Sequence, residues 1–228
     1  MKYFIPMILL LLMQHQCSTS SSSKLSSENE QLMQGGKKTV IVEDSLSNAL
    51  FLNCTTWINS WEKNLTTDSF VFVKNYMLPS ISWWEDFDIL EESNALYCDM
   101  LCYSPNGMWV LDLYSSQIEL SKDNSKIHGT MDVDTEVYLI DVKRKQRMPI
   151  FQCGSLESVD DGFWLSDSVT IIVGSTTCLE NGSQTYQPYM LMINVFTGNA
   201  SEFKYTKKFP HPNMNFLKQK FPKIIFDL

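Results

Sequence analysis

Residues 137–142 read VYLIDV, and residues 190–195 read MLMINV. Both runs are short, rich in apolar residues and bounded by turn residues, which is the pattern of a β-strand. Runs of this kind follow one another from residue 69 onward, and they decide the fold class. The predicted strands are 70–76, 108–114, 117–120, 126–131, 136–142, 147–152, 169–174, 189–196 and 201–205.

Turn signals separate the predicted strands. Residues 104–107 (SPNG) place proline second and glycine fourth, as a type I turn prefers. Residues 197–199 (TGN) predict a tight hairpin, and Asn181 with Gly182 predicts another reversal. With many strands and one clear helical pattern, the sequence predicts a mainly β fold of antiparallel sheets.

A helical pattern precedes the strands. Apolar residues recur at intervals of three and four over residues 45–63, which predicts a helix with Asp44 or Ser45 as its N-cap. Trp57 and Trp61 lie on the apolar stripe. They either pack against the sheet or form a face on which a sugar or another ligand stacks.

The strand-rich part also repeats itself. Residues 103–110 lead into a strand and are followed by VYLIDV; residues 164–171 and 190–195 give the same order again. These segments, within residues 99–205, resemble the blades of a β-propeller. A blade takes about 40–50 residues, so the folded part holds about three, whereas a closed propeller needs at least four. The resemblance therefore implies an antiparallel meander or partial propeller-like sheets, with one N-terminal helix.

The first residues have the composition of an export signal. Lys2 precedes an uncharged apolar run over residues 3–13, and polar residues follow. The run is too short to span a bilayer as a helix, and it matches the apolar region of a signal peptide. No A-x-A pattern marks a conventional cleavage site. Residues 1–16 are therefore predicted to be a signal peptide.

Cys17, directly before the serine-rich residues 18–23, resembles the lipid-attachment cysteine of bacterial lipoproteins. That resemblance implies a fatty-acyl anchor that tethers the protein to a membrane of the cell envelope. The chain departs from the pattern at His15 and Gln16, where such lipoproteins usually carry small residues. An ordinary secreted protein is the alternative. We interpret residues 17–38 as the attachment cysteine with a flexible tether and residues 39–228 as one mostly β domain.

Charge and cysteine content exclude several classes of protein. The formal net charge of −8 disfavours binding to nucleic acid. Without Cys17 five cysteines remain, and an odd number argues against a complete disulfide framework. Cys98 and Cys102 are the nearest pair and are candidates for a disulfide, although small buried apolar residues are the alternative. With three histidines in the chain and no metal-ligand spacing, we predict no metal site.

The richest candidate site lies in residues 80–88 (SISWWEDFD). It places aromatic rings beside carboxylates, as a carbohydrate site does, with rings for stacking and acids for hydrogen bonding or hydrolysis. A solvated acidic edge is the other explanation. The candidate ligand-binding residues are Trp83, Trp84, Glu85, Asp86 and Asp88.

The sequence also contains two smaller patterns. Asp160, Asp161 and Trp164 form an acidic and aromatic group that a turn entering a strand explains equally well. Residues 210–228 predict a short helix and a strand that pack on the domain.

No motif in the chain specifies a reaction. The sequence lacks a G-x-S-x-G nucleophile motif and a phosphate-binding glycine loop, so we predict no catalytic residues and no cofactor. The favoured function is an envelope-anchored binding or scaffold protein, whose partners are glycans or other envelope proteins and not nucleic acid. The alternative is a secreted hydrolase that acts on glycans through the acids beside Trp83 and Trp84.

Overall fold

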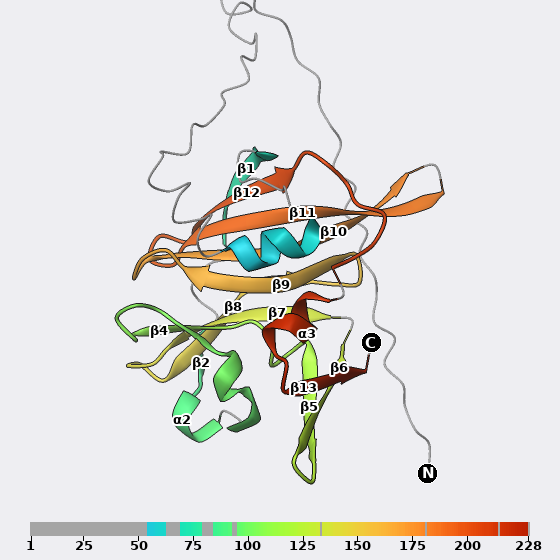
Figure 1. The fold of residues 1–228 in the computed structure, drawn as a ribbon. Helices are drawn as coiled ribbons and strands as arrows, with labels where there is room; N and C mark the ends of the chain where they lie inside the picture. The colour runs from blue at the N-terminus through green and yellow to red at the C-terminus, as the bar shows by residue number, and fades with distance from the viewer. Residues whose placement is uncertain are drawn as a thin grey trace, which may run out of the picture. The chain divides into compact units, whose positions relative to one another are not determined.

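The computed structural model describes residues 54–62, 69–78, 84–92, 95–132, 134–180, 182–213 and 215–227. All of them belong to the compact unit Thr39–Leu228. The predicted signal peptide and tether lie outside the described residues. Within the described part the fold is mainly β, as the sequence predicts, and its strands form three sheets (Figure 1).

Sheet A has five antiparallel strands in the order β1-β12-β11-β10-β9. Gly182 has a φ of +79° and lies in the short turn between the two longest strands. Gly198, with a φ of +71°, lies in the following turn, so both predicted reversals are confirmed. The strands are β1 (Phe70–Met77), β9 (Glu157–Trp164), β10 (Val169–Glu180), β11 (Ser183–Asn194) and β12 (Asn199–Tyr205).

Sheet B repeats the topology of sheet A, with the order β2-β8-β7-β4-β3. Four strands form an antiparallel meander in each sheet, and one strand from earlier in the chain pairs with the last strand of that meander. The internal repeat in the sequence therefore corresponds to two sheets of the same topology. The strands are β2 (Glu85–Asp86), β3 (Cys102–Tyr103), β4 (Trp109–Asp112), β7 (Thr135–Asp141) and β8 (Gln146–Cys153).

Sheet C is a hairpin inserted between β4 and β7, to which the C-terminal strand is added. It consists of β5 (Ile118–Asp123), β6 (Lys126–Met131) and β13 (Ile224–Asp227), and β13 pairs with β6 in parallel. The short helix α3 (Phe216–Lys220) precedes β13. The C-terminal segment thus forms the helix and the strand that the sequence predicts.

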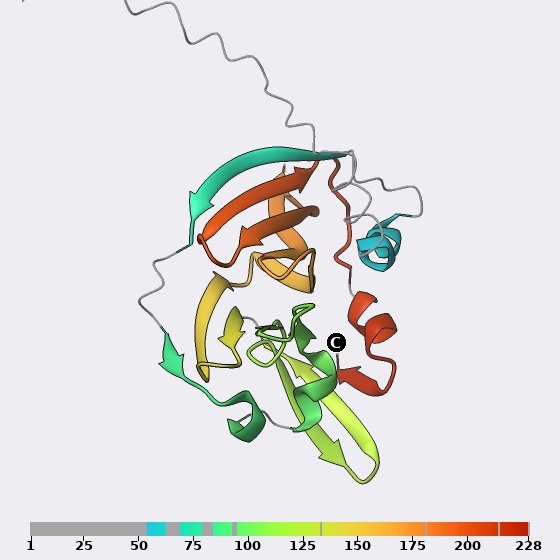
Figure 2. The same ribbon diagram turned by 90° about the vertical axis from the view of Figure 1, so that its left-hand side faces the viewer.

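The helix of residues 54–61 packs on one face of sheet A (Figure 1). Its side chains Cys54, Trp57 and Ile58 are buried with apolar side chains of β10, β11 and β12. The packing explanation for Trp57 is therefore confirmed. Figure 2 shows that α3 lies on the same side of the sheets as this helix. The predicted start of the helix at residue 45 lies outside the described residues.

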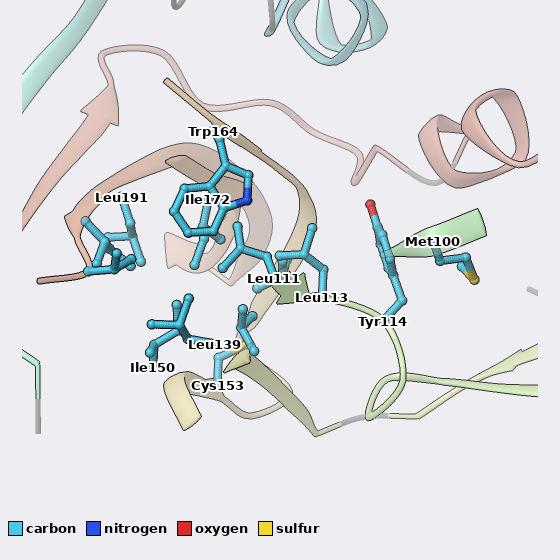
Figure 3. Packing of buried hydrophobic residues seen from close by; sticks show 14 of the residues in the cluster. Met100, Leu111, Leu113, Tyr114, Leu139, Ile150, Cys153, Trp164, Ile172 and Leu191 are labelled. Carbon is cyan, nitrogen blue, oxygen red and sulfur yellow. The ribbon is translucent and has the colours of Figure 1, made fainter. Parts of the chain in front are cut away.

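The largest core fills the space between sheets A and B. Leu111, Leu139, Ile172 and Leu191 meet there, and each is almost completely buried (Figure 3). The neighbours of Ile172 in β10 point to the opposite face, toward helix 54–61. Burial on both faces explains why Ile171, Ile172 and Val173 are apolar in succession rather than alternating with polar residues. Two short helices, α2 (Ile89–Glu92) and η3 (Ala95–Met100), lie beside sheet B.

Strand β9 is the main difference from the sequence prediction, which left residues 157–164 without a strand. Val173 pairs with Asp161, and the next residue, Gly174, pairs with Val159. Asp160 is therefore the extra residue of a β-bulge. Aspartates and glycine disfavour strands, but an edge strand with a bulge accommodates them.

Candidate functional site

A pocket of about 420 Å³ opens between sheet B and the turn that joins β11 to β12 in sheet A. We call it the aromatic pocket. Its volume falls in the range of small-molecule sites. The lining residues are Trp84, Met108, Trp109, Asp141, Lys143, Arg144, Val195 and Phe196.

Trp109 is the most enclosed ring of the pocket, with 8% of its surface exposed. It follows the SPNG turn, in which the Gly107 N–H donates to the Ser104 carbonyl at 2.8 Å, as the sequence predicts. The backbone N–H of Trp109 donates to Ser104 Oγ at 3.0 Å. The Asn106 N–H donates to the Asp167 carboxylate at 2.9 Å, which fixes this turn to sheet A. The turn therefore fixes the backbone of Trp109.

Two rings are arranged around Trp109. The Trp84 ring lies 6.1 Å from it at an interplanar angle of 40°, and the Phe196 ring lies 5.8 Å from it at 75°. Phe196 is 55% exposed and belongs to a turn in which the Asn194 side chain accepts the N–H groups of Phe196 and Thr197. The pocket thus combines enclosed indoles with one solvent-facing ring, which suits a ligand with a flat apolar face.

The polar side of the pocket is positively charged. Asp141 is buried, accepts the Arg144 backbone N–H at 2.8 Å and lies 3.6 Å from Arg144 Nε. Lys143 and the Arg144 side chain are exposed. Two cations and one engaged carboxylate therefore form the rim, although the chain as a whole is acidic.

The indole N–H groups of Trp84 and Trp109 are buried, and neither finds an acceptor among the described residues. A buried donor without a partner costs about 1–3 kcal/mol, and native proteins avoid this cost at most sites. Two such donors beside one pocket indicate acceptors that lie outside the described residues.

The structure brings one of the predicted site residues, Trp84, to the pocket; Trp83 lies outside the described residues. The acids lie elsewhere. Glu85 forms an ion pair with Arg147, Asp88 forms one with Lys145, and the Asp86 carboxylate lies 3.5 Å from the Gln146 amide. These contacts attach β2 and the residues after it to β8 and the β7–β8 turn.

Sequence reasoning missed the lining residues of the β7–β8 and β11–β12 turns, Lys143, Arg144 and Phe196. Local sequence patterns predict that these residues lie near turns, but they do not predict that the two turns lie close together. The predicted bridge between Cys98 and Cys102 stays a prediction: both are free thiols in the structure, and burial raises the pKa of Cys102 to about 11.

Among the described residues, no group of three histidine, cysteine or acidic side chains is placed to hold a metal ion. None of the described helices is long and apolar enough to cross a membrane. Comparison with protein-family models, with curated proteins and with solved structures finds no match to this chain.

Proposed function

We propose that this chain is an exported binding protein that holds a glycan in the aromatic pocket. The observation that carries the proposal is the grouping of Trp84, Trp109 and Phe196 around one opening with a charged rim. A pyranose ring has an apolar face that packs on an aromatic ring and hydroxyl groups that bond to charged or N–H groups. The exposed Phe196 ring supplies the stacking surface, and Arg144 with Lys143 supplies donors.

Binding is favoured over hydrolysis. Glycoside hydrolysis requires two carboxyl groups on either side of the scissile bond. Among the described residues, the pocket lining contains one carboxylate, Asp141, and that group is engaged with Arg144. The acids beside Trp84 are paired with side chains of the β7–β8 hairpin. These contacts support a binding protein rather than a hydrolase.

We further propose that Cys17 carries a lipid and holds the domain at the cell envelope. The support is in the sequence, in the apolar leader, the cysteine that follows it and the serine-rich residues 18–23. Cells that express the full chain and receive a radioactive fatty acid should label the protein, and Cys17→Ala should abolish the label. Unlabelled wild type, or a labelled variant, would refute the anchor and favour the secreted alternative.

Isothermal titration calorimetry of the full chain against a panel of oligosaccharides tests the glycan proposal. We expect at least one oligosaccharide to bind, and Phe196→Ala to weaken its binding about tenfold or more because the stacking surface is lost. Leu179→Ala is the matched control, since Leu179 is 75% exposed and does not line the pocket. The proposal fails if no glycan binds, or if the Phe196 variant binds as tightly as the control.

A further inference from the structure

A second and smaller pocket, of about 150 Å³, lies between the sheets on the side of β1. Phe151 of sheet B lines it together with side chains of β1, β9, β11 and β12 in sheet A. None of its lining residues belongs to the aromatic pocket. We call it the β1 pocket.

Three aromatic rings line the β1 pocket, those of Tyr76, Phe151 and Tyr189. The rings of Phe151 and Tyr189 lie 6.1 Å apart at 46°. The Tyr189 hydroxyl donates to the Ser158 carbonyl at 3.0 Å, which fixes the direction of its ring. Aromatic faces carry partial negative charge and attract cations.

Two carboxylates face the same space. Glu202 is largely enclosed, with 13% of its side chain exposed, whereas Glu157 is exposed. Burial, and after it the negative charges of Glu202 and Glu157, raises the pKa of Tyr76 to about 12. The field of both carboxylates therefore reaches the ring that lines the pocket.

The protein's own chain already places an ammonium at this position. Lys74 Nζ lies 3.2 Å from a Glu202 carboxylate oxygen and 5.5 Å from the centre of the Tyr76 ring. The Lys74 side chain is 61% exposed, so it is free to swing into solvent. Glu202 also has a second cation, Lys204, at 3.2 Å, so it keeps a partner when Lys74 leaves.

We propose that the β1 pocket binds a small primary amine, whose ammonium lies among the three rings and pairs with Glu157 while Lys74 moves aside. When Lys74 moves aside, Glu157 and Glu202 remain with Lys204 alone, and the net negative charge favours a cation over an anion. The small volume favours a free amine over a polymer. This site is independent of the proposed glycan site.

The test uses phenethylamine as the probe and 2-phenylethanol as its uncharged counterpart, titrated into the full chain by calorimetry. We expect the amine to bind at least tenfold more tightly than the alcohol. Glu157→Gln should weaken amine binding about tenfold, and Lys74→Ala should strengthen it because a competing ammonium is removed. Tyr76→Phe, which keeps the ring, should bind the amine within about threefold of wild type.

Each alternative result overturns the proposal. Equal binding of amine and alcohol would mean an apolar pocket without charge recognition, and no binding of either would mean no site. Unchanged binding by Glu157→Gln, or weaker binding by Lys74→Ala, would contradict the assigned contacts. Glu157 is exposed, so this variant is expected to fold, and its urea midpoint checks that.

Discussion

The indole N–H of Trp57 donates a 2.8 Å hydrogen bond to the carboxylate of Asp160. This contact joins the helix of residues 54–61 to the bulge in edge strand β9. The other Asp160 oxygen lies 3.3 Å from the Ser158 hydroxyl, which donates to it. Burial raises the pKa of Asp160 to about 7, although both hydrogen bonds lower it.

Stability is predicted to fall as the pH rises, through Asp160. The folded chain holds the Asp160 proton up to a pH of about 7, whereas in the unfolded chain the pKa of this carboxyl is near its ordinary value of 3.8. The folded state therefore binds more protons between these values, and the stabilising contribution present below about pH 4 is lost as the pH rises through 7. Asp160→Asn should stabilise the protein by about 1–3 kcal/mol at pH 8 and flatten this slope. Urea unfolding between pH 4 and 8 measures how the free energy of unfolding depends on pH. If the Asp160→Asn variant showed the same pH dependence as wild type, the raised pKa of Asp160 would be contradicted.

Trp57→Phe should destabilise the protein by about 2–3 kcal/mol, because it removes core volume and the hydrogen bond to a partly buried carboxylate. Trp61→Phe is the control. Trp61 is less buried than Trp57, and its indole N–H has no acceptor among the described residues, so Trp61→Phe should lower the free energy of unfolding by less. Chemical unfolding of both variants gives the comparison. Equal losses of unfolding free energy would mean that the hydrogen bond from Trp57 to Asp160 does not contribute to stability.

Gly174→Ala should be strongly destabilising. A Cβ at Gly174 would lie 1.9 Å from the Ser158 carbonyl oxygen. Because this oxygen belongs to the backbone, it can move away only if the β-bulge in β9 changes its conformation. We expect a loss of about 2–4 kcal/mol from overpacking. At Gly154 the nearest atom would lie 3.7 Å away, so Gly154→Ala should stay within about 0.5 kcal/mol of wild type. Melting temperatures that fall equally for both would show that the close approach is relaxed in solution.

Ser104→Ala should weaken the turn that positions Trp109. Ser104 is buried, and its hydroxyl accepts the backbone N–H of Trp109 and donates to Asn106 Oδ1 at 2.9 Å. Removing the hydroxyl should therefore lower the free energy of unfolding by about 1–2 kcal/mol. Ser166 bonds to the backbone in a similar way but is exposed, and Ser166→Ala should cost less. The tryptophan emission of the protein, to which Trp109 contributes, should shift in the first variant alone; an unchanged spectrum there would mean that the Trp109 ring is held by other contacts.

The combined substitution Glu85→Gln, Asp86→Asn and Asp88→Asn should leave glycan affinity within about threefold of wild type. These acids pair with residues of the β7–β8 hairpin and do not line the pocket. Calorimetry with an oligosaccharide that binds wild type decides the matter. A loss of affinity beyond tenfold would return the site to these acids, as the hydrolase hypothesis requires.

Local patterns determine much of this fold. Runs such as VYLIDV form strands because their β-branched and apolar side chains are buried on a sheet, and the glycines of the SPNG and TGN turns take the positive φ that those turns require. The spacing of the apolar side chains in helix 54–61 likewise predicts which face is buried. Strand β9 could not be predicted in this way, because Asp160, Asp161 and Gly162 disfavour strands when taken alone.

By itself the sequence determined the fold class, the turns and the repeat that becomes two sheets of the same topology. Only the tertiary structure decided which residues line the aromatic pocket. Trp84, Trp109, Arg144 and Phe196 come from four separate segments, and strand pairing together with the packing of sheet A on sheet B brings them to one pocket. The acids beside Trp84 have the composition of a site, but their pairing with β8 is a long-range contact that local propensity does not encode.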